Sequence, residues 1–381
     1  MLIIIRVIIS LGDIMKKVVI GMSGGVDSSV AAYLLVKQGY EVVGLFMRNW
    51  DSTINNEIIG IENMEDSICT QEQDYNDAKK VCEKLEIPLY RVDFVKEYWD
   101  YVFKYFLDEL KKGRTPNPDI MCNKYIKFDL FIKEAKRLGA EYIATGHYAR
   151  IYNGKLLRGV DNNKDQTYFL SQITNKQLEN VLFPIGELNK LDVRNIALDL
   201  NLNTAQKKDS TGICFIGERN FRDFLKNYLP NIEGDMVNID TNKVIGKHIG
   251  LMYYTIGQRR GLDIGGNTKR LYVVGKNLND NVLYVSYGDN NKYLNSDAAI
   301  IEQVNWLSDK KPTKCTAKFR YRQPDQEVYL EYLDNSNIKV SYNNIKAVTP
   351  GQACVFYLGD ECIGGGIIKD ILKEGKRLWY L

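Results

Sequence analysis

Residues 21–29 read GMSGGVDSS, and this stretch decides the fold of the first half of the chain. An apolar run, VVIGM, leads into it and the pattern VAAYLLVKQG leads out, which predicts a strand, a tight loop and a helix. Glycines let the backbone turn closely around an anion, and the amides at a helix start attract phosphate. The Gly-Lys-Ser/Thr ending of a Walker loop is missing, and GxGxxG does not fit. The stretch therefore predicts a phosphate-binding loop of another kind; the alternative is a Gly/Ser turn with Asp27 or Ser28 as helix cap.

Short apolar runs and helical patterns keep alternating up to about residue 145. This alternation is typical of an α/β domain, a doubly wound parallel sheet wrapped by helices. Two more helical patterns follow, at 175–183 and 192–200. The expected strands are 18–22, 41–48, 89–94 and 141–146, and the expected helices are 30–39, 74–85 and 96–112.

From about residue 234 the chain changes character, because Gly, Asn and Asp turns recur between short β-branched and aromatic runs. The segment 270–286 predicts a β-hairpin. We expect three domains: 15–217, which carries the phosphate-binding loop, a small central domain over 218–294, and a β-rich domain over 295–381.

The composition is that of an ordinary globular protein, with 381 residues, 45% of them hydrophobic and 26% charged. A net charge of +3 does not by itself announce a nucleic-acid partner, so any RNA surface must come from local patches. Seven cysteines without a CxxC pair favour a reducing, cytoplasmic location. The apolar run in residues 1–14 is too short to span a bilayer and contains Arg6, so we expect no membrane association and translation from Met15.

Two cysteines lie in unusual sequence contexts. Cys122 follows NPDIM, and Cys214 lies in DSTGICFIGER, close to two lysines. Both contexts predict loops, where basic neighbours lower a thiol pKa and favour the thiolate. Cys82 on an amphipathic helix and Cys354 in a strand are expected to be buried and inert.

The motif SGGVDS resembles the PP-loop of the N-type ATP pyrophosphatases, which activate a carbonyl by transferring AMP to it. Further blocks resemble the tRNA-specific 2-thiouridylases, and together the blocks run in order from about residue 17 to 262, with one more near the C-terminus. These blocks are GRTPNPDIMCNKYIKF, ATGHYAR, KDQTYFLS, STGICFIGERNFRDFL, YTIGQRRGL and PGQACVFY.

The resemblance implies a PP-loop adenylating domain, a small central domain and a C-terminal β-barrel. It also implies the reaction, in which ATP activates the wobble uridine of tRNA and sulfur replaces its 2-oxygen. The tRNAs for Lys, Glu and Gln are the expected acceptors, and a cysteine desulfurase or a sulfur-relay protein is the expected sulfur donor. Because Asp27 cannot help to hold pyrophosphate without an intervening cation, magnesium is expected beside it.

The resemblance assigns residue roles as follows. Cys214 receives sulfur as a persulfide; Cys122 either releases that sulfur or resolves the persulfide into a Cys122–Cys214 disulfide. Independently of the resemblance, Asp119 is the better candidate for proton handling, because the chain has only two histidines. ATP would be bound by Gly21, Met22, Ser23, Gly24, Gly25, Val26, Asp27, Ser28, Met47 and Gly146. The tRNA would be contacted by Asn117, Pro118, Asp119, His147, Lys164, Asp165, Gln166, Arg320, Tyr321 and Gln352.

Blander interpretations stay open for single residues. Met47 taken alone favours core packing, and Asp119 equally fits a turn cap. The basic cluster KFRYR (318–322) taken alone favours solvated surface. If Arg320 is an exposed RNA contact, its loss should barely change stability. For the whole chain, the alternatives are an amide-forming ATP pyrophosphatase with structural cysteines and a non-catalytic nucleotide-binding protein associated with RNA.

Overall fold

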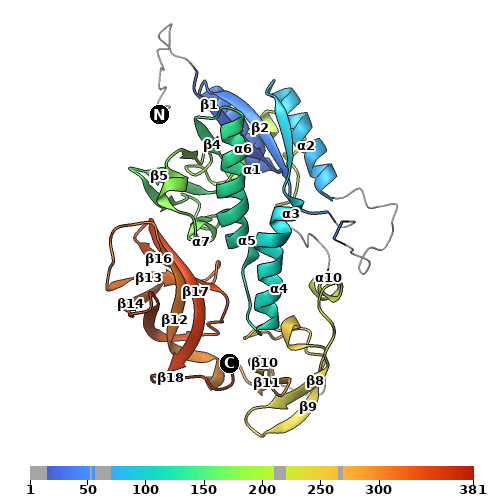
Figure 1. The fold of residues 1–381 in the computed structure, drawn as a ribbon, viewed down its shortest axis with the longest axis vertical. Helices are drawn as coiled ribbons and strands as arrows, with labels where there is room; N and C mark the ends of the chain where they lie inside the picture. The colour runs from blue at the N-terminus through green and yellow to red at the C-terminus, as the bar shows by residue number, and fades with distance from the viewer. Residues whose placement is uncertain (1–14, 52–53, 56–69, 210–219, 265–268) are drawn as a thin grey trace.

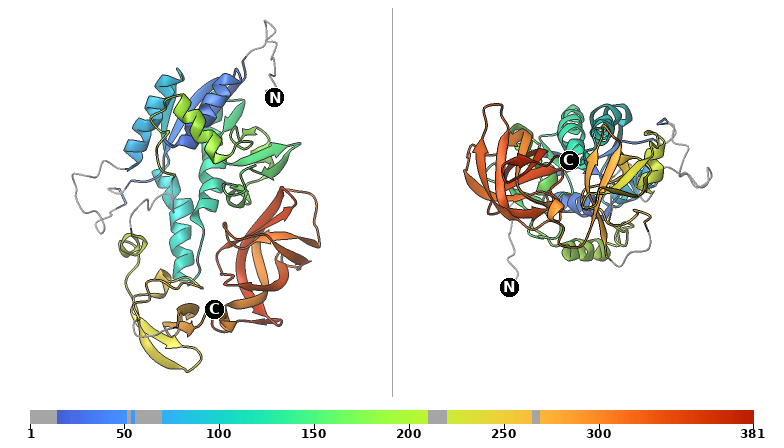
Figure 2. Two further views of the ribbon diagram at one scale, coloured as in Figure 1. Left: turned by 180° about the vertical axis from the view of Figure 1, so that it is seen from behind. Right: turned by 90° about the horizontal axis from the view of Figure 1, so that it is seen from below.

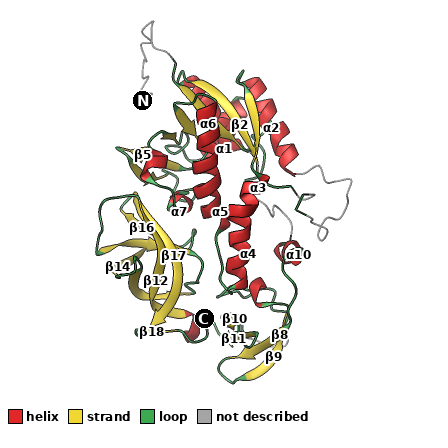
Figure 3. Cartoon of the chain, viewed as in Figure 1, coloured by secondary structure: helices red, strands yellow, loops and turns green. Residues whose placement is uncertain are grey.

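The protein is described by a computed structural model that covers residues 15–51, 54–55, 70–209, 220–264 and 269–381. Along the chain follow an α/β unit, a small β-sheet unit and a β-barrel (Figure 1). Helices gather in the α/β unit, whereas the C-terminal third is almost entirely strands and loops (Figure 3). Within the described residues, no helix is long and apolar enough to cross a membrane.

The α/β unit is built on a parallel sheet with the strand order β3-β2-β1-β4-β7. All four strands that the sequence predicted for this unit are confirmed. The order reverses between β1 and β4, and ligands of open α/β sheets bind outside the strand ends at such a point. The strands are β1 Lys17–Met22, β2 Glu41–Arg48, β3 Leu89–Asp93, β4 Tyr142–Ala144 and β7 Val181–Leu182.

Helices cover both faces of this sheet (Figure 1). The three helices predicted before residue 145 are confirmed, and the third continues through a π-helical turn. The helices and helical turns of this unit are α1 Val26–Lys37, α2 Thr70–Lys84, α3 Val95–Tyr98, η1 Trp99–Phe103, α4 Lys104–Lys111, α5 Pro118–Met121, η2 Cys122–Leu130, α6 Phe131–Arg137, α7 Thr167–Leu170, α8 Asn175–Leu178 and α9 Lys190–Asp199.

The helix predicted over 175–183 is wrong in its second half. Only α8 is helical, and Val181 and Leu182 instead pair with Ile143 and Ala144 as the edge strand β7. A short apolar run fits a strand as well as a helix, and the open edge of β4 decides between them.

The core lies on both sides of the sheet because residues of β1 alternate between its faces. Val18 and Ile20 pack into a cluster with residues of α1, α2 and α9. Val19 faces the opposite cluster, which contains Phe103 and Phe128. These two residues belong to the helical segments from α3 to α6, which we call the helical column. All three β1 residues are fully buried, so the strand fixes the position of the loop that follows it.

The small central unit is a four-stranded sheet of order β10-β11-β8-β9. The predicted hairpin is confirmed, since β10 and β11 pair antiparallel. Lys276 of β10 donates a hydrogen bond of 2.8 Å to the Gly113 carbonyl just beyond α4, which joins this unit to the helical column. Its elements are α10 Phe221–Lys226, β8 Gly234–Asn238, β9 Lys243–His248, η3 Leu251–Tyr253, β10 Leu271–Asn277 and β11 Val282–Tyr287.

The C-terminal unit is a barrel closed by pairing of its first long strand, β12, with β17 (Figure 2). A hairpin of the α/β unit, β5 and β6, extends the same sheet through the pair Leu157 and Glu361. The fold class predicted from the sequence is thus confirmed, while the three domain limits stay a prediction. The elements are β5 Ala149–Tyr152, β6 Lys155–Arg158, η4 Lys292–Leu294, β12 Asn295–Trp306, β13 Lys314–Lys318, β14 Gln326–Tyr332, β15 Ile338–Lys346, β16 Ala353–Leu358, β17 Glu361–Lys373 and β18 Lys376–Arg377.

Candidate active site

The glycine-rich loop lies where the sheet order reverses, between the ends of β1 and β4. Gly24 has a φ of +71°, and a Cβ atom there would collide with the backbone carbonyl of Asp74. Beyond β4, a Cβ on Gly146 would lie only 2.8 Å from the amide nitrogen of Ser28. Only glycine fits at these two positions, because another part of the backbone lies too close for a Cβ atom. Gly24 follows β1 and Gly146 follows β4, the two strands between which the sheet order reverses.

The serines of the loop hold its shape. Ser28 accepts a hydrogen bond of 3.2 Å from the Ser23 amide, and Ser29 donates one of 2.7 Å to the Gly25 carbonyl. Gly25 precedes α1 and has no side chain with which to cap it, so neither Asp27 nor Ser28 is the helix cap. The first amides of this 12-residue helix face an end without a capping side chain, the usual arrangement of an anion site.

Gly21 and Met47 meet at the base of the loop. A Cβ on Gly21 would lie 3.7 Å from the Met47 methyl group and 3.6 Å from the ring of Phe131. Met47 is half-buried and packs against the core, so core packing is confirmed for part of its side chain. A contact of Met47 with ATP stays a prediction.

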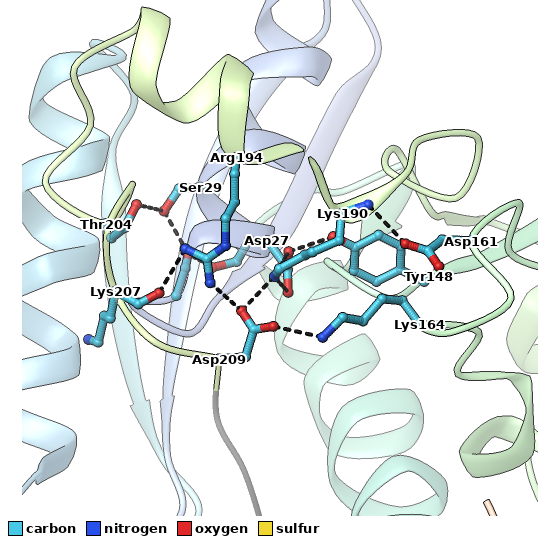
Figure 4. Close-up of polar contacts among 12 residues, drawn as sticks. Asp27, Ser29, Tyr148, Asp161, Lys164, Lys190, Arg194, Thr204, Lys207 and Asp209 are labelled. Carbon is cyan, nitrogen blue, oxygen red and sulfur yellow. Dashed lines mark hydrogen bonds and ion pairs between the residues drawn. The ribbon is translucent and has the colours of Figure 1, made fainter. Parts of the chain in front are cut away.

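Asp27 is paired with a cation from a distant part of the chain. Lys190 donates to both carboxylate oxygens at 2.7 and 2.9 Å, and the Tyr148 hydroxyl donates at 2.8 Å (Figure 4). Burial and the neighbouring Asp27 raise the pKa of Tyr148, which keeps its hydroxyl a donor. The sequence predicted a cation beside Asp27 and suggested that it is magnesium. The structure places the Lys190 side chain beside Asp27, and a magnesium ion there stays a prediction.

Sequence reasoning missed Lys190, Arg194, Lys207 and Asp209, which surround the loop (Figure 4). Lys207 donates to the Gly24 carbonyl at 3.0 Å and to two carboxylates of α2, which clamps the loop against that helix. One signal was available: Lys190 is the first residue of α9, where a positive charge opposes the helix dipole. A residue placed against a local preference is a candidate for function.

The Asn117–Pro118–Asp119 turn begins α5. The side chain of Asn117 accepts the Asp119 amide at 3.1 Å, so Asn117 is the helix cap and the cap interpretation of Asp119 is wrong. Burial raises the pKa of the Asp119 carboxyl, and Lys127 opposes this only in part. A raised pKa favours the protonated carboxyl, which is the direction that a proton donor needs.

Cys122 is not in a loop, as the sequence suggested, but is the first residue of the π-helical segment η2. Its side chain is buried. Neighbouring Asn123 donates to the carbonyls of Asp119 and Phe169 at 3.0 and 3.2 Å, which fixes the segment on both sides. The helix forms because the Pro118 turn starts it and Ile126 and Phe128 anchor it in the core.

The second cysteine of the hypothesis, Cys214, lies outside the described residues. Its environment and its approach to Cys122 therefore stay predictions. The two cysteines expected to be inert are confirmed as buried. Burial raises the pKa of Cys82 to about 12 and raises the pKa of Cys354 well above its usual value.

The barrel docks on the turn that leads to Asp119. Gln352 donates to the Thr115 carbonyl at 2.7 Å, and the Thr115 amide donates to the Pro350 carbonyl at 2.9 Å. From the same barrel, the Tyr321 ring packs against Phe169 of α7 with 4.4 Å between ring centroids. Two residues that the resemblance assigned to tRNA, Gln352 and Tyr321, thus both contact the α/β unit from the barrel.

Arg320 is not the exposed residue that the sequence suggested. Its guanidinium donates to the carbonyls of Ile256 and Ala347 at 3.0 and 2.8 Å and to the Thr349 hydroxyl at 2.8 Å. Burial lowers its pKa. Arg320 joins the central unit to the barrel, so its loss should cost stability, and only Arg322 of this cluster is exposed.

The other predicted tRNA residues have partners within the chain. Asp165 is buried and accepts from Thr167, and Gln166 accepts the Tyr148 amide at 3.0 Å. His147 is buried beside Thr145, and burial lowers its pKa well below the usual value. Lys164 donates to the Asp209 carboxylate at 2.7 Å.

The fold and this site define a PP-loop nucleotide-binding α/β protein joined to a small β unit and a β-barrel. Three family models match in that order: the tRNA methyl transferase HUP domain at 16–218, the tRNA methyl transferase PRC-barrel domain at 222–287, and the aminomethyltransferase beta-barrel domain at 296–368. The chain is also similar over nearly its full length to curated bacterial proteins.

These relatives carry one name, tRNA-specific 2-thiouridylase MnmA. The protein of Mesoplasma florum is 57% identical and that of Mycoplasma mycoides subsp. mycoides 56%, each over 94% of this chain and 100% of the relative. The protein of Bacillus cytotoxicus is 56% identical over 96% of this chain and 98% of the relative. This chain belongs to the tRNA-specific 2-thiouridylase MnmA family.

Proposed function

We propose that this chain is a tRNA 2-thiouridylase that uses ATP to activate the 2-carbonyl of the anticodon wobble uridine and then replaces its oxygen by sulfur. The uracil 2-oxygen attacks the α-phosphorus of ATP, and pyrophosphate leaves. Sulfur from a persulfide then attacks C2, and AMP leaves with the original oxygen. Adenylation comes first because a urea-like carbonyl is a poor electrophile.

The observation that supports this proposal is that the glycine-rich loop and the helical segment with Asp119 and Cys122 are connected by packing at one edge of the sheet. The glycine-rich loop and Gly146 form an anion cradle where the strand order reverses. The helical column that bears Asp119 and Cys122 continues to Phe131, which packs at the base of that loop. The continuous helical segment from Cys122 to Phe131 therefore connects this cysteine to the proposed nucleotide-binding loop.

In the proposed sulfur step, Cys214 carries the persulfide and Cys122 completes the transfer. Either Cys122 attacks the Cys214 persulfide and releases hydrosulfide, or it cleaves the mixed disulfide formed between the base and Cys214. Both routes end in a Cys122–Cys214 disulfide, which a thiol reductant must reopen. Asp119 handles the proton, and the Gln352 and Tyr321 junction supports the flipped base.

Partners and cofactors follow from this chemistry. We infer that tRNA is the substrate, with the Lys, Glu and Gln acceptors as the finer expectation, and that a cysteine desulfurase or a sulfur-relay protein supplies sulfur. Magnesium is expected only as a companion of ATP. Among the described residues, no three His, Cys, Asp or Glu side chains cluster as a metal site.

The test is nucleoside mass analysis of tRNA after incubation of the full chain with ATP, magnesium and a persulfide source. We expect 2-thiouridine from the parent protein. Cys214→Ser and Cys122→Ser should form no product yet still release pyrophosphate in the presence of tRNA. Thiolation at the parental rate by both variants would contradict the two-cysteine route, and pyrophosphate release without any thiolated tRNA would favour the amide-forming alternative.

A further inference from the structure

Asp209 is surrounded by three cations (Figure 4). It accepts from Lys164 at 2.7 Å, from Lys190 at 2.8 Å and from Arg194 at 2.7 Å. Partial burial raises the pKa of this carboxyl, but the hydrogen bonds from Lys164 and Lys190 outweigh it and lower the pKa to about 2. Asp209 therefore stays an anion at every working pH.

The cations come from two parts of the chain, and one of them, Lys190, contacts the glycine-rich loop. Lys164 lies in the turn after β6, while Lys190 and Arg194 are four residues apart on one face of α9. Lys190 bridges Asp209 to Asp27 of the loop, and its side chain is only 12% exposed. The side chains of these three cations thus share two carboxylates, Asp27 and Asp209, beside the glycine-rich loop. A third carboxylate, Asp161, accepts the Lys190 amide at 3.0 Å.

The position of Lys190 is energetically unfavourable for two reasons. A nearly buried ammonium at the start of α9 opposes the helix dipole, and its desolvation is offset only by good partners. Lysine and arginine bind carboxylate and phosphate with the same donors, and phosphate carries the larger charge. A ligand with several phosphate groups would be held more strongly than one carboxylate.

We propose that Lys164, Lys190 and Arg194 form a polyphosphate subsite, and that Asp209 occupies this subsite as an internal anion until the terminal phosphates of the nucleotide displace it. The proposal rests on the proposed use of ATP. It gives Lys164 a nucleotide role in place of the tRNA contact expected from the sequence. It also explains why the cation beside Asp27 is a side chain.

The experiment measures the affinity of the full chain for inorganic tripolyphosphate and for ATP by calorimetry, without tRNA. Asp209→Asn should tighten tripolyphosphate binding on the order of tenfold, because it removes the competing anion but keeps the side-chain shape. Lys190→Met should weaken binding on the order of tenfold, and Lys190→Arg should restore most of it. Asp199→Asn and Lys136→Met, at exposed helix positions, are the matched controls and should change nothing.

Unchanged or weaker tripolyphosphate binding by folded Asp209→Asn would overturn the proposal. If thermal melting shows that this variant is unfolded, Lys164→Met decides, because Lys164 is more than one-third exposed and its loss should leave the fold intact. Weaker tripolyphosphate binding by Lys164→Met supports the subsite; weaker tRNA binding alone overturns it. Failure of the parent protein to thiolate tRNA would instead reject the proposed function, which is measured separately.

Discussion

Two carboxyl groups of the same α/β unit are shifted in opposite directions. At the nucleotide edge, lysines overcome burial and lower the pKa of Asp209 to about 2. In the turn before Cys122, burial dominates and raises the pKa of Asp119. The first environment is built to hold charge, and the second favours a neutral acid. The difference shows that one α/β unit keeps one carboxyl as an anion and favours the neutral form of another. Asp119 lies in helix α5, whereas Asp209 follows helix α9.

The largest effect is expected at Asp119. Asp119→Asn should lower the rate of thiolation by roughly 10²–10⁴-fold, because a positioned proton carrier contributes that much. If Asp119 acts as a base, the parent rate falls as the pH drops through its raised pKa, and the variant should lose this acidic limb. The measurement is a pH profile of 2-thiouridine formation.

Asp129→Asn, on the same helical column but half-exposed and paired with Lys133, is the control for Asp119→Asn and should keep the parental profile. A full rate and an unchanged profile for Asp119→Asn would remove the contrast between the two carboxyl groups. Asp119 would then serve only the geometry of the turn.

The next effect tests the nucleotide edge alone. Gly24→Ala should weaken ATP binding by roughly tenfold or more, because alanine is strained at a φ of +71° and its Cβ collides with the Asp74 carbonyl. Gly25→Ala is the matched control, since its φ is −99° and its Cβ would lie 3.4 Å from the Ser23 hydroxyl. Calorimetry with ATP compares them; equal affinities would mean that the shape of the loop is not needed for binding.

The smallest effect concerns stability in acid. Because the pKa of buried His147 is lowered in the fold, the unfolded chain binds a proton below pH 6.5 that the folded chain does not. Stability is therefore complete above pH 6.5 and falls below it, by at most about 1.4 kcal/mol per pH unit for this group. His147→Asn should reduce the loss of unfolding free energy between pH 7 and pH 5.5 in urea titrations.

His248 offers an internal comparison, since burial also lowers its pKa although its hydrogen bond with Asn281 opposes the shift. His248→Gln should therefore reduce the acid sensitivity less than His147→Asn does. The reverse order would show that the pocket around His147 is more polar than its burial indicates.

Local features of the site were predictable because short-range physics sets them. The apolar run, the glycines and the serines of residues 21–29 satisfy one another within a few residues, as the Ser23 to Ser28 hydrogen bond illustrates. A strand, a loop and a helix start follow from such a stretch in any fold that contains it. The hairpin at 270–286 was predictable for the same reason.

Predictions of secondary structure and exposure failed at residues that interact with a distant segment of the chain. Val181 and Leu182 became a strand because the edge of β4 was open. Arg320 is half-buried because carbonyls of the central unit and the barrel converge on it. A single sequence carries no signal for such partners, since burial and pairing depend on which segments the fold brings together.

The sequence by itself determined the strand, the glycine-rich loop and the helix start of residues 18–37, and the alternation that builds the parallel sheet. Only the tertiary structure decided that Lys190, 163 residues from Asp27, provides the cation beside it. It also decided that Gln352 of the barrel holds the Thr115 turn from 237 residues away. The physical reason is range: a loop's hydrogen bonds close within a few residues, whereas ion pairs and docking contacts form only after packing has placed their partners.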